Sequence, residues 1–125
     1  MYKEWLKEKD VKEFMANGYK CIVKRHKTMK HLCGYVHITK SHKLYGIGYS
    51  NLYDMNIDIE VHGGLTYAEK ENEDWVFGFD CAHLGDLVPG MEEYGIIQEE
   101  EIYRNMEYVE HETRHLANQL KGLEK

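Results

Sequence analysis

Long apolar runs and proline are both scarce in this chain of 125 residues. No stretch approaches the roughly 20 apolar residues that a membrane-spanning helix needs, so we expect no membrane span. The N-terminus alternates charged and apolar residues and lacks the continuous apolar core of a secretory signal. With a single proline, 42% hydrophobic residues and 30% charged residues, the chain is typical of one globular domain over residues 1–125.

Cysteine is also rare, and its number is odd: Cys21, Cys33 and Cys81. An extracellular disulfide framework normally uses an even number of cysteines. We therefore expect a cytoplasmic protein.

Positive charge is in short supply, with 16 Lys and Arg against 22 Asp and Glu and a formal net charge of -6. Binding of nucleic acid by bulk electrostatics needs a basic face, so this charge argues against it. One stretch, "KCIVKRHKTMKH" from Lys20 to His31, is locally basic. We interpret it as a solvated hairpin with exposed charges; the alternative is a patch that follows phosphates.

The spacing of apolar residues predicts the elements. Residues 2–17 place apolar side chains on one side of a helix, broken near Asp10, and Gly18 can end that helix. The period then changes to β-branched and aromatic alternation, which predicts about five strands. These strands are expected at 19–26, 32–39, 57–62, 65–69 and 75–80.

The strand patterns and the helical C-terminus together predict an α+β fold. In it, a long C-terminal helix packs on one face of an antiparallel sheet of about five strands. That helix is expected over 99–121, with Gly122 as its stop, and residues 41–56 look like a long ordered loop. The other sheet face needs cover from the loop, the first helix or a second subunit in a homodimer. The expected contacts of the helix with the sheet are Ile102, Met106, Val109, Leu116 and Leu120.

The letters "HETRH" from His111 to His115 fit the pattern of a zinc protease, in which two histidines one helical turn apart hold the metal. At ~100° per residue, the apolar residues of this helix gather around Thr113. His111 and His115 then lie roughly 160° away, on the face opposite the core. We therefore expect both histidines in solvent and interpret the motif as accidental.

Chemistry is expected instead where the glycine turn after Val61 meets the exit of the strand that ends at Asp80. If the strands at 57–62, 65–69 and 75–80 form a meander, these two points share one end of the sheet. This convergence would bring together His62, Asp80, His83 and Asp86. Two imidazoles and two carboxylates suit a catalytic divalent ion such as Zn²⁺, Mn²⁺ or Fe²⁺, a metal-free catalytic or ligand site, or plain structural capping.

Other residues could serve the same cleft. Gly63 and Gly64 let a ligand approach the backbone closely, and Tyr67 follows them. His42 and Tyr45 lie on the loop 41–56, where an aromatic ring beside glycines suits stacking on a base. Cys81 could act as a nucleophile activated by a neighbouring histidine, although cysteine after an apolar strand is more often inert.

Four stretches carry a resemblance: Cys33 to Gly46, "HGGLTY", "WVFGFDCAHLGD", and Tyr103 to Leu120. They are similar to a family of small uncharacterised proteins encoded by bacteriophages and prophages. The block matching Ser41-His42-Lys43 often reads Gly-His-Pro in that family, and its last helix need not carry HExxH. The resemblance implies a phage origin, hence the host cytoplasm, and directs attention to His42 and the four convergent residues without implying an activity.

The sequence thus predicts a phage-type accessory protein that binds a small polar, nucleotide-like ligand in a cleft at one end of the sheet. Hydrolysis assisted by a divalent metal is one version of this hypothesis, with the four convergent residues as ligands or acid–base groups. The alternative is a non-enzymatic counter-defence protein that binds a host protein or sequesters a signal.

Overall fold

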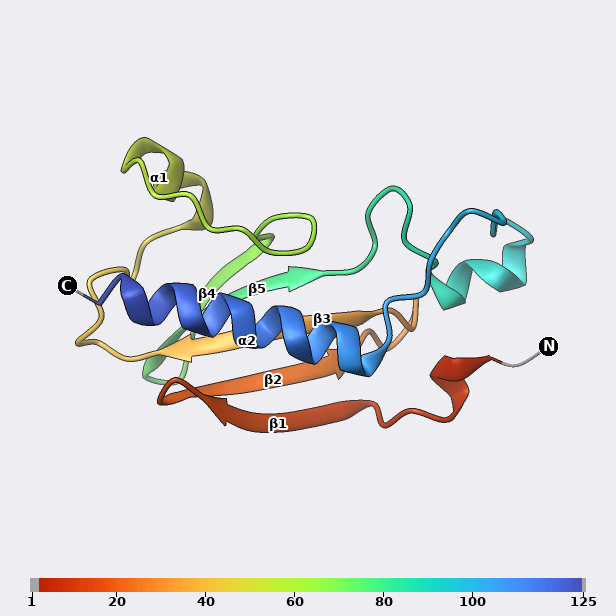
Figure 1. Cartoon of the computed structure of the whole chain (residues 1–125), viewed down its shortest axis with the longest axis horizontal. Helices are drawn as coiled ribbons and strands as arrows, with labels where there is room; N and C mark the ends of the chain where they lie inside the picture. The colour runs from red at the N-terminus through yellow and green to blue at the C-terminus, as the bar shows by residue number, and fades with distance from the viewer. Residues whose placement is uncertain (1–2, 125) are drawn as a thin grey trace.

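The computed structural model describes residues 3–124 and, for Glu93, the backbone only. It has one antiparallel sheet with the long helix α2 lying across it (Figure 1). The 3-10 turns are η1 (Glu4–Leu6) and η2 (Pro89–Tyr94), and the helices are α1 (Tyr49–Asp54) and α2 (Met106–Gly122). The strands are β1 (Val11–Ala16), β2 (Tyr19–Arg25), β3 (Leu32–Ile38), β4 (Tyr67–Glu71) and β5 (Asp74–Asp80).

The sheet has five strands in the order β1-β2-β3-β5-β4, and every neighbouring pair is antiparallel. The long connection from β3 to β4 carries α1 and places β4 at the edge, so that β5 pairs with β3. In the register of that central pair, Cys33 lies opposite Asp80. This end of the sheet, where β2 and β5 finish and β3 begins, is where most of the polar side chains discussed below are gathered.

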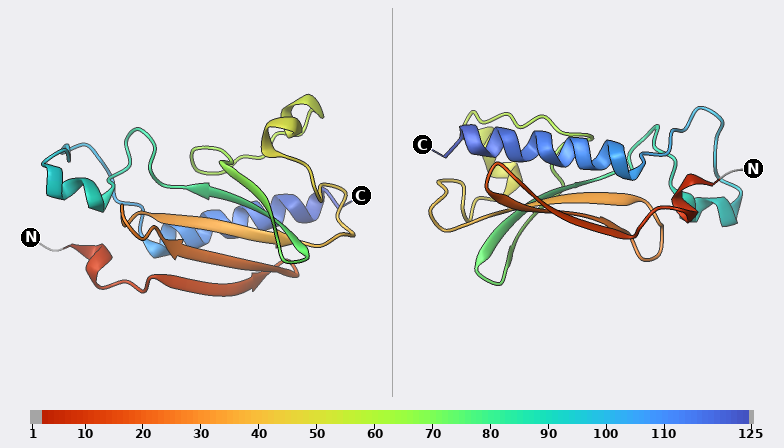
Figure 2. Two further views of the ribbon diagram at one scale, coloured as in Figure 1. Left: turned by 180° about the vertical axis from the view of Figure 1, so that it is seen from behind. Right: turned by 60° about the horizontal axis from the view of Figure 1, so that its bottom comes forward.

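One face of the sheet is covered by α2 together with the extended segment 57–66 (Figures 1 and 2). The alternating residues of the strands point into this layer, where they form the core with one stripe of α2. Asn105 caps the helix by accepting a hydrogen bond from the backbone N–H of Tyr108. The buried residues of α2 are Val109, Thr113, Leu116, Ala117 and Leu120. None of the helices within residues 3–124 is both long enough and apolar enough to pass through a membrane.

Helix and sheet approach closely at Gly34, in the middle of β3. A Cβ atom at this position would lie 2.2 Å from Thr113 Oγ1 and 2.5 Å from the ring of Phe79. Thr113 is fully buried and donates its hydroxyl to the carbonyl of Val109, which satisfies its polar atom inside α2. The missing side chain of Gly34 therefore sets how closely the helix packs on the sheet.

No helix crosses the opposite face of the sheet in the described part of the chain (Figure 2). The register places Lys24, Tyr35 and Tyr67 on this face. Val76 and His37 are nevertheless buried there by their neighbours, while Val11 and Met15 of the edge strand are exposed. This open face is the mixed polar and aromatic surface on which the candidate site lies.

The α+β fold and the antiparallel sheet of five strands are confirmed, but the predicted helix over 2–17 is wrong. Tyr2 lies outside the described residues, and beyond it the chain forms only the turn η1 and then β1. Asn17 and Gly18 have φ values of 55° and 85°, so they form the tight turn of a β1–β2 hairpin. The apolar residues are spaced as in a helix, but the backbone of residues 11–16 pairs with β2 and forms a strand instead.

The predicted strand over 57–62 is also wrong, although the segment is extended. Its backbone pairs with side chains of α2 instead of a neighbouring strand. Gln119 accepts from the N–H of Glu60 and donates to its carbonyl, and Glu112 accepts from the N–H of His62. The alternating apolar residues of the segment pack against the core from this position.

Two further boundaries differ from expectation. The helix predicted from residue 99 begins only at Met106, because Ile102 pairs with the loop after β5: its N–H donates to the Gly85 carbonyl and its carbonyl accepts from Leu87. Ile102 is 55% exposed and does not pack on the sheet, whereas Val109, Leu116 and Leu120 do. The expected loop 41–56 contains the short helix α1.

Replacing Gly34 with alanine should lower the free energy of unfolding by about 3 kcal/mol, because the new methyl group overlaps Thr113 and Phe79. Gly48→Ala is the control, since its φ is -67° and the nearest atom to its Cβ is Asn51 Nδ2 at 3.6 Å. Urea unfolding measures both. Equal stability of the two variants would contradict the close approach of α2 to β3.

Candidate functional site

A buried carboxylate, Asp86, lies in the loop that follows β5. Its side chain is 1% exposed and accepts hydrogen bonds from three parts of the chain. His62 Nε2 lies 2.9 Å from Oδ2, the backbone N–H of His83 donates to the same oxygen at 3.0 Å, and Arg104 Nε lies 2.9 Å from Oδ1. Burial alone would raise the pKa of Asp86, but these bonds lower it below its usual value. Asp86 is therefore an ionised acceptor.

His62 connects this carboxylate to α2. Because an ionised carboxylate only accepts, Nε2 of His62 donates to Asp86, and Nδ1 lies at hydrogen-bond distance, 2.8 Å, from the hydroxyl of Tyr108. Burial, followed by the charge of Glu112, raises the pKa of Tyr108, so its phenol stays protonated. Hydrogen bonds thus connect Tyr108, His62, Asp86 and Arg104, and both ring nitrogens of His62 are engaged.

A hollow of about 520 Å³ opens beside this network, on the open face of the sheet. We call it the His31 hollow. It is in the size range of small-ligand sites. Its lining residues come from the β2–β3 hairpin, the central strands and the loop after β5, and they are His26, His31, Cys33, Tyr35, Thr66, Tyr67, Phe79, Asp80, Ala82 and His83.

His31 lines this hollow, and one of its ring nitrogens is buried without a partner. The residue is only 7% exposed, and its Nδ1 makes no hydrogen bond. Its ring stacks on that of His26, with centroids 4.9 Å apart. Burial, followed by the neighbouring His26, lowers the pKa of His31, so the ring is neutral at neutral pH. A buried polar atom without a partner costs stability, and such atoms are rare unless a ligand or water completes them.

Asp80 and His83 form the adjacent wall. Asp80 accepts from the hydroxyl of Thr66 at 3.0 Å and from the N–H of Ala82 at 3.1 Å. His83 Nε2 lies 3.2 Å from Asp80 Oδ1, at ion-pair distance but without hydrogen-bond geometry. The ring of His83 is held by Gly63, where a Cβ atom would lie 2.2 Å from it. The glycine turn therefore positions the imidazole and does not itself line the hollow.

Two tyrosines form the aromatic side of the hollow. The rings of Tyr35 and Tyr67 meet edge to face at 5.3 Å. Tyr35 reaches across β5 because Gly78 has no side chain; a Cβ atom there would lie 2.6 Å from the ring. Tyr67 donates its hydroxyl to Glu71 at 2.6 Å, which fixes the direction of its ring. Rings held in this way suit contact with a planar ligand.

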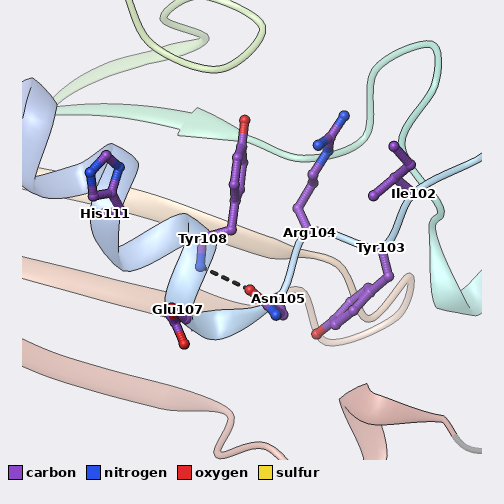
Figure 3. A pocket seen from close by; sticks show the side chains of 7 residues that line it. All are labelled: Ile102, Tyr103, Arg104, Asn105, Glu107, Tyr108 and His111. Carbon is purple, nitrogen blue, oxygen red and sulfur yellow. Dashed lines mark hydrogen bonds between the residues drawn. The ribbon is translucent and has the colours of Figure 1, made fainter.

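A second hollow, of about 490 Å³, lies at the start of α2 (Figure 3). Most of its polar groups are engaged in the fold. Asn105 caps the helix, Tyr108 bonds to His62, and Arg104 bonds to Asp86 through Nε. Glu8 also accepts from the N–H of Met106. With no unpartnered buried group in its lining among the described residues, this hollow is the weaker candidate.

The structure brings together the four residues that the sequence singles out. His62 bonds to Asp86, His83 lies beside Asp80, and the rings of His62 and His83 are 6.0 Å apart. The expected meander does not exist, since 57–62 is not a strand. The segments meet because the side chains of Asp86 and Glu112 bind the backbone and ring around residue 62. The convergence is therefore real for a different reason.

His42 and Tyr45 do not belong to this site. His42 is 4% exposed; its Nε2 lies 2.7 Å from the carbonyl of Leu120, and its Nδ1 accepts from the N–H of Leu44. Tyr45 donates to the carbonyl of Glu73, near the turn between β4 and β5. Both lie at the other end of the sheet, so a role in the cleft is wrong for them. Tyr67 does line the His31 hollow, whereas Gly64 lies in the adjacent turn.

Metal and thiol chemistry find little support in the geometry. Within residues 3–124, no group of three or more His, Cys, Asp or Glu side chains is arranged to hold a metal ion. Asp86 is already saturated by His62, His83 and Arg104. Burial raises the pKa of Cys33 to about 11, and it also raises that of the fully buried Cys81. The inert interpretation of Cys81 therefore fits the structure.

The outward direction of the "HETRH" histidines is confirmed, because His111 and His115 are exposed while Thr113 between them is buried. In Figure 3 the ring of His111 projects from α2 among the residues that line the second hollow. Sequence reasoning missed His31, Tyr35, Arg104 and Tyr108. The stretch from Lys20 to His31 drew notice for its charge, but its position at the end of a hairpin beside Asp80 depends on strand register.

No protein-family model, curated protein or solved structure matches this chain, so its function has to be inferred from the fold and the geometry of the site.

Gly63→Ala and Gly64→Ala should separate the contact with His83 from backbone strain. Both glycines have positive φ, 68° and 81°, but only Gly63 touches His83, and nothing lies within 4 Å of a Cβ at Gly64. Gly64→Ala should cost about 1 kcal/mol of unfolding free energy. Gly63→Ala should cost about 2 kcal/mol more and shift the NMR signals of the His83 ring. An unmoved His83 ring in Gly63→Ala would refute this packing.

Asp86→Asn should lower the free energy of unfolding by about 3 kcal/mol at pH 7, because Arg104 loses its buried counter-charge. The folded-state pKa of Asp86 is below its unfolded value of about 3.9. Its contribution is therefore present above about pH 4 and is lost as the pH falls through the folded-state value. Urea unfolding should be measured at pH 7, 5 and 3. The difference in unfolding free energy between Asp86→Asn and the wild type should narrow only at pH 3. The exposed Asp58→Asn is the control, and a gap independent of pH would count against the ion pair.

Proposed function

We propose that this protein binds a small polar ligand in the His31 hollow, at the end of the sheet where β2 and β5 finish. The observation that carries this proposal is the unpartnered Nδ1 of the buried His31. A neutral imidazole nitrogen in this position offers one hydrogen bond that the fold does not use. A small rotation of the His31 ring would expose this nitrogen to a ligand with a polar edge.

The neighbouring groups support a polar ligand over an apolar one. Asp80 uses each carboxylate oxygen once within the protein, through Ala82 and Thr66, and each oxygen has capacity to accept again. His83 adds a second imidazole, and Tyr67 adds an aromatic surface. Acceptors and donors that converge on one concave surface give orientation as well as affinity.

The same geometry suits binding more directly than catalysis. Acid–base chemistry, if the ligand reacts, falls to His83, whose ring has Asp80 beside it as an orienting carboxylate. His62 and Asp86 serve to hold the wall in place, since their hydrogen bonds are already made within the protein. Binding is common to a hydrolase and to a protein that sequesters a signal, and the phage-type role stays a prediction.

His31→Phe tests the proposal. Phenylalanine keeps a flat ring against His26 but removes the unpartnered nitrogen, so the free energy of unfolding should rise by about 1 kcal/mol while ligand binding is lost. Binding is measured by ¹⁵N NMR with a panel of nucleosides, nucleoside monophosphates, amino acids and monosaccharides. A bound probe should shift the amide signals of Thr66 and Ala82.

Asp80→Asn should weaken the same probe about tenfold, because the carboxylate loses charge and one acceptor. The exposed Asp58→Asn is the matched control and should leave binding unchanged. The proposal fails if no member of the panel shifts the signals of the hollow, or if shifts gather instead around Arg104 and His111. It also fails if His31→Phe lowers stability and leaves binding intact.

A further inference from the structure

The His31 hollow continues into a second one. A neighbouring hollow of about 380 Å³ shares His26, Cys33 and Tyr35 with it. We call this the Lys24 hollow; its other lining residues are Lys24, Arg25, Lys27 and Thr28. Three shared residues place the two hollows side by side on the open face. An elongated ligand could therefore occupy both, with a different part in each.

The Lys24 hollow differs from the rest of the molecule in charge. Between Lys20 and His31 the chain has four lysines and one arginine and no acidic residue, in a protein whose net charge is -6. Arg25 is neutralised by Glu8 and Asp10. Lys24 and Lys27 are exposed at the hollow, and His26 directs its Nδ1 to the N–H groups of Thr28 and Met29. The cationic groups at this end suit an anionic group of the ligand.

The His31 hollow provides the opposite kind of surface. Tyr67, in edge-to-face contact with Tyr35, offers an aromatic ring for stacking, and Asp80 offers an acceptor for an N–H group. Tyr35 lines both hollows, and Lys24 Nζ lies 5.2 Å from the centre of its ring. This tyrosine therefore marks the boundary between an anion-binding end and a ring-binding end.

We propose that the two hollows together bind a nucleoside monophosphate. Its base stacks on Tyr67 with its polar edge toward His31 and Asp80, and its phosphate lies at Lys24, Lys27 and His26. Both features of the ligand are needed, because a neutral base leaves the cationic end unused and a lone phosphate leaves the aromatic end unused. This assignment rests on the proposed function of the His31 hollow and names the class of ligand.

Isothermal titration calorimetry of the whole chain tests it with four nucleoside 5′-monophosphates, the matching nucleosides and inorganic phosphate. At least one monophosphate should bind about tenfold more tightly than its nucleoside, because the phosphate makes charge-assisted contacts. That advantage should shrink as salt is added. Inorganic phosphate alone should bind more weakly than the monophosphate.

Matched variants test which hollow binds the phosphate and which binds the base. Lys24→Gln should remove the advantage of the monophosphate over the nucleoside, whereas Lys20→Gln should not. Lys20 lies on the same face of the same strand, is also exposed, pairs with Glu13 at 3.7 Å and lines neither hollow. Tyr67→Leu should weaken nucleoside and monophosphate alike, by about tenfold, and Tyr67→Phe should keep the affinity of both.

The outcomes separate this proposal from the one it rests on. Equal affinity for nucleoside and monophosphate at the His31 hollow would overturn the assignment and leave ligand binding there intact. Tighter binding of a single-stranded oligonucleotide than of any monophosphate would also overturn it, in favour of nucleic acid. The absence of binding by every member of both panels would overturn both proposals. Loss of the phosphate advantage in Lys20→Gln and Lys24→Gln alike would show a diffuse charge effect and reject the built anion end.

Discussion

The arrangement of the site depends on one buried carboxylate. Asp86 receives hydrogen bonds from a side chain on the extended segment, from the backbone of its own loop, and from Arg104 just before α2. An ionised group this deep in a protein is stable only when such partners replace its water. Three segments that are distant in sequence are therefore fixed relative to one another by a single charge, and Glu112 adds a fourth bond by holding the backbone of His62.

The three histidines near Asp86 differ in how their ring nitrogens are bonded. His62 has both ring nitrogens engaged within the protein, so it holds the wall together. His31, across the hollow, is more buried than His62 and has a nitrogen with no partner. His83 packs against the glycine turn and lies beside Asp80. The capacity for recognition therefore lies on the open side of the sheet, and the stabilising bonds lie on the side of the helix.

The sheet itself explains why that side is available. Glycine at position 34 lets α2 approach β3 closely on one face, and glycine at position 78 lets Tyr35 lie flat across β5 on the other. The first contact supports the core, and the second creates an aromatic surface next to polar groups at the strand ends. The basic hairpin end between β2 and β3 then borders this surface because β3 pairs directly with β5.

Much of the architecture could be predicted from local patterns. Strand alternation located β2, β3, β4 and β5, and the position of Thr113 on the helical wheel correctly turned His111 and His115 outward. The first hairpin was missed because its apolar residues also fit a helical period, although Asn17-Gly18 is a strong signal for a tight turn. The segment 57–62 was misassigned because an alternating pattern reports burial on one side and does not reveal what pairs with the backbone.

By itself the sequence determined the fold class and the buried stripe of α2, because these follow from periodicity close in the chain. It also singled out the four residues near the exit of β5, but the meander that it predicted for them does not exist. The tertiary structure alone decided which of those residues are engaged in the fold and which face open space. His31 and Tyr35 belong to the site through strand order and register, and Arg104 through its bond to Asp86. His42 lies outside it and bonds to the end of α2. The physical reason is that hydrogen-bond satisfaction is a property of distant partners, and no local pattern records it.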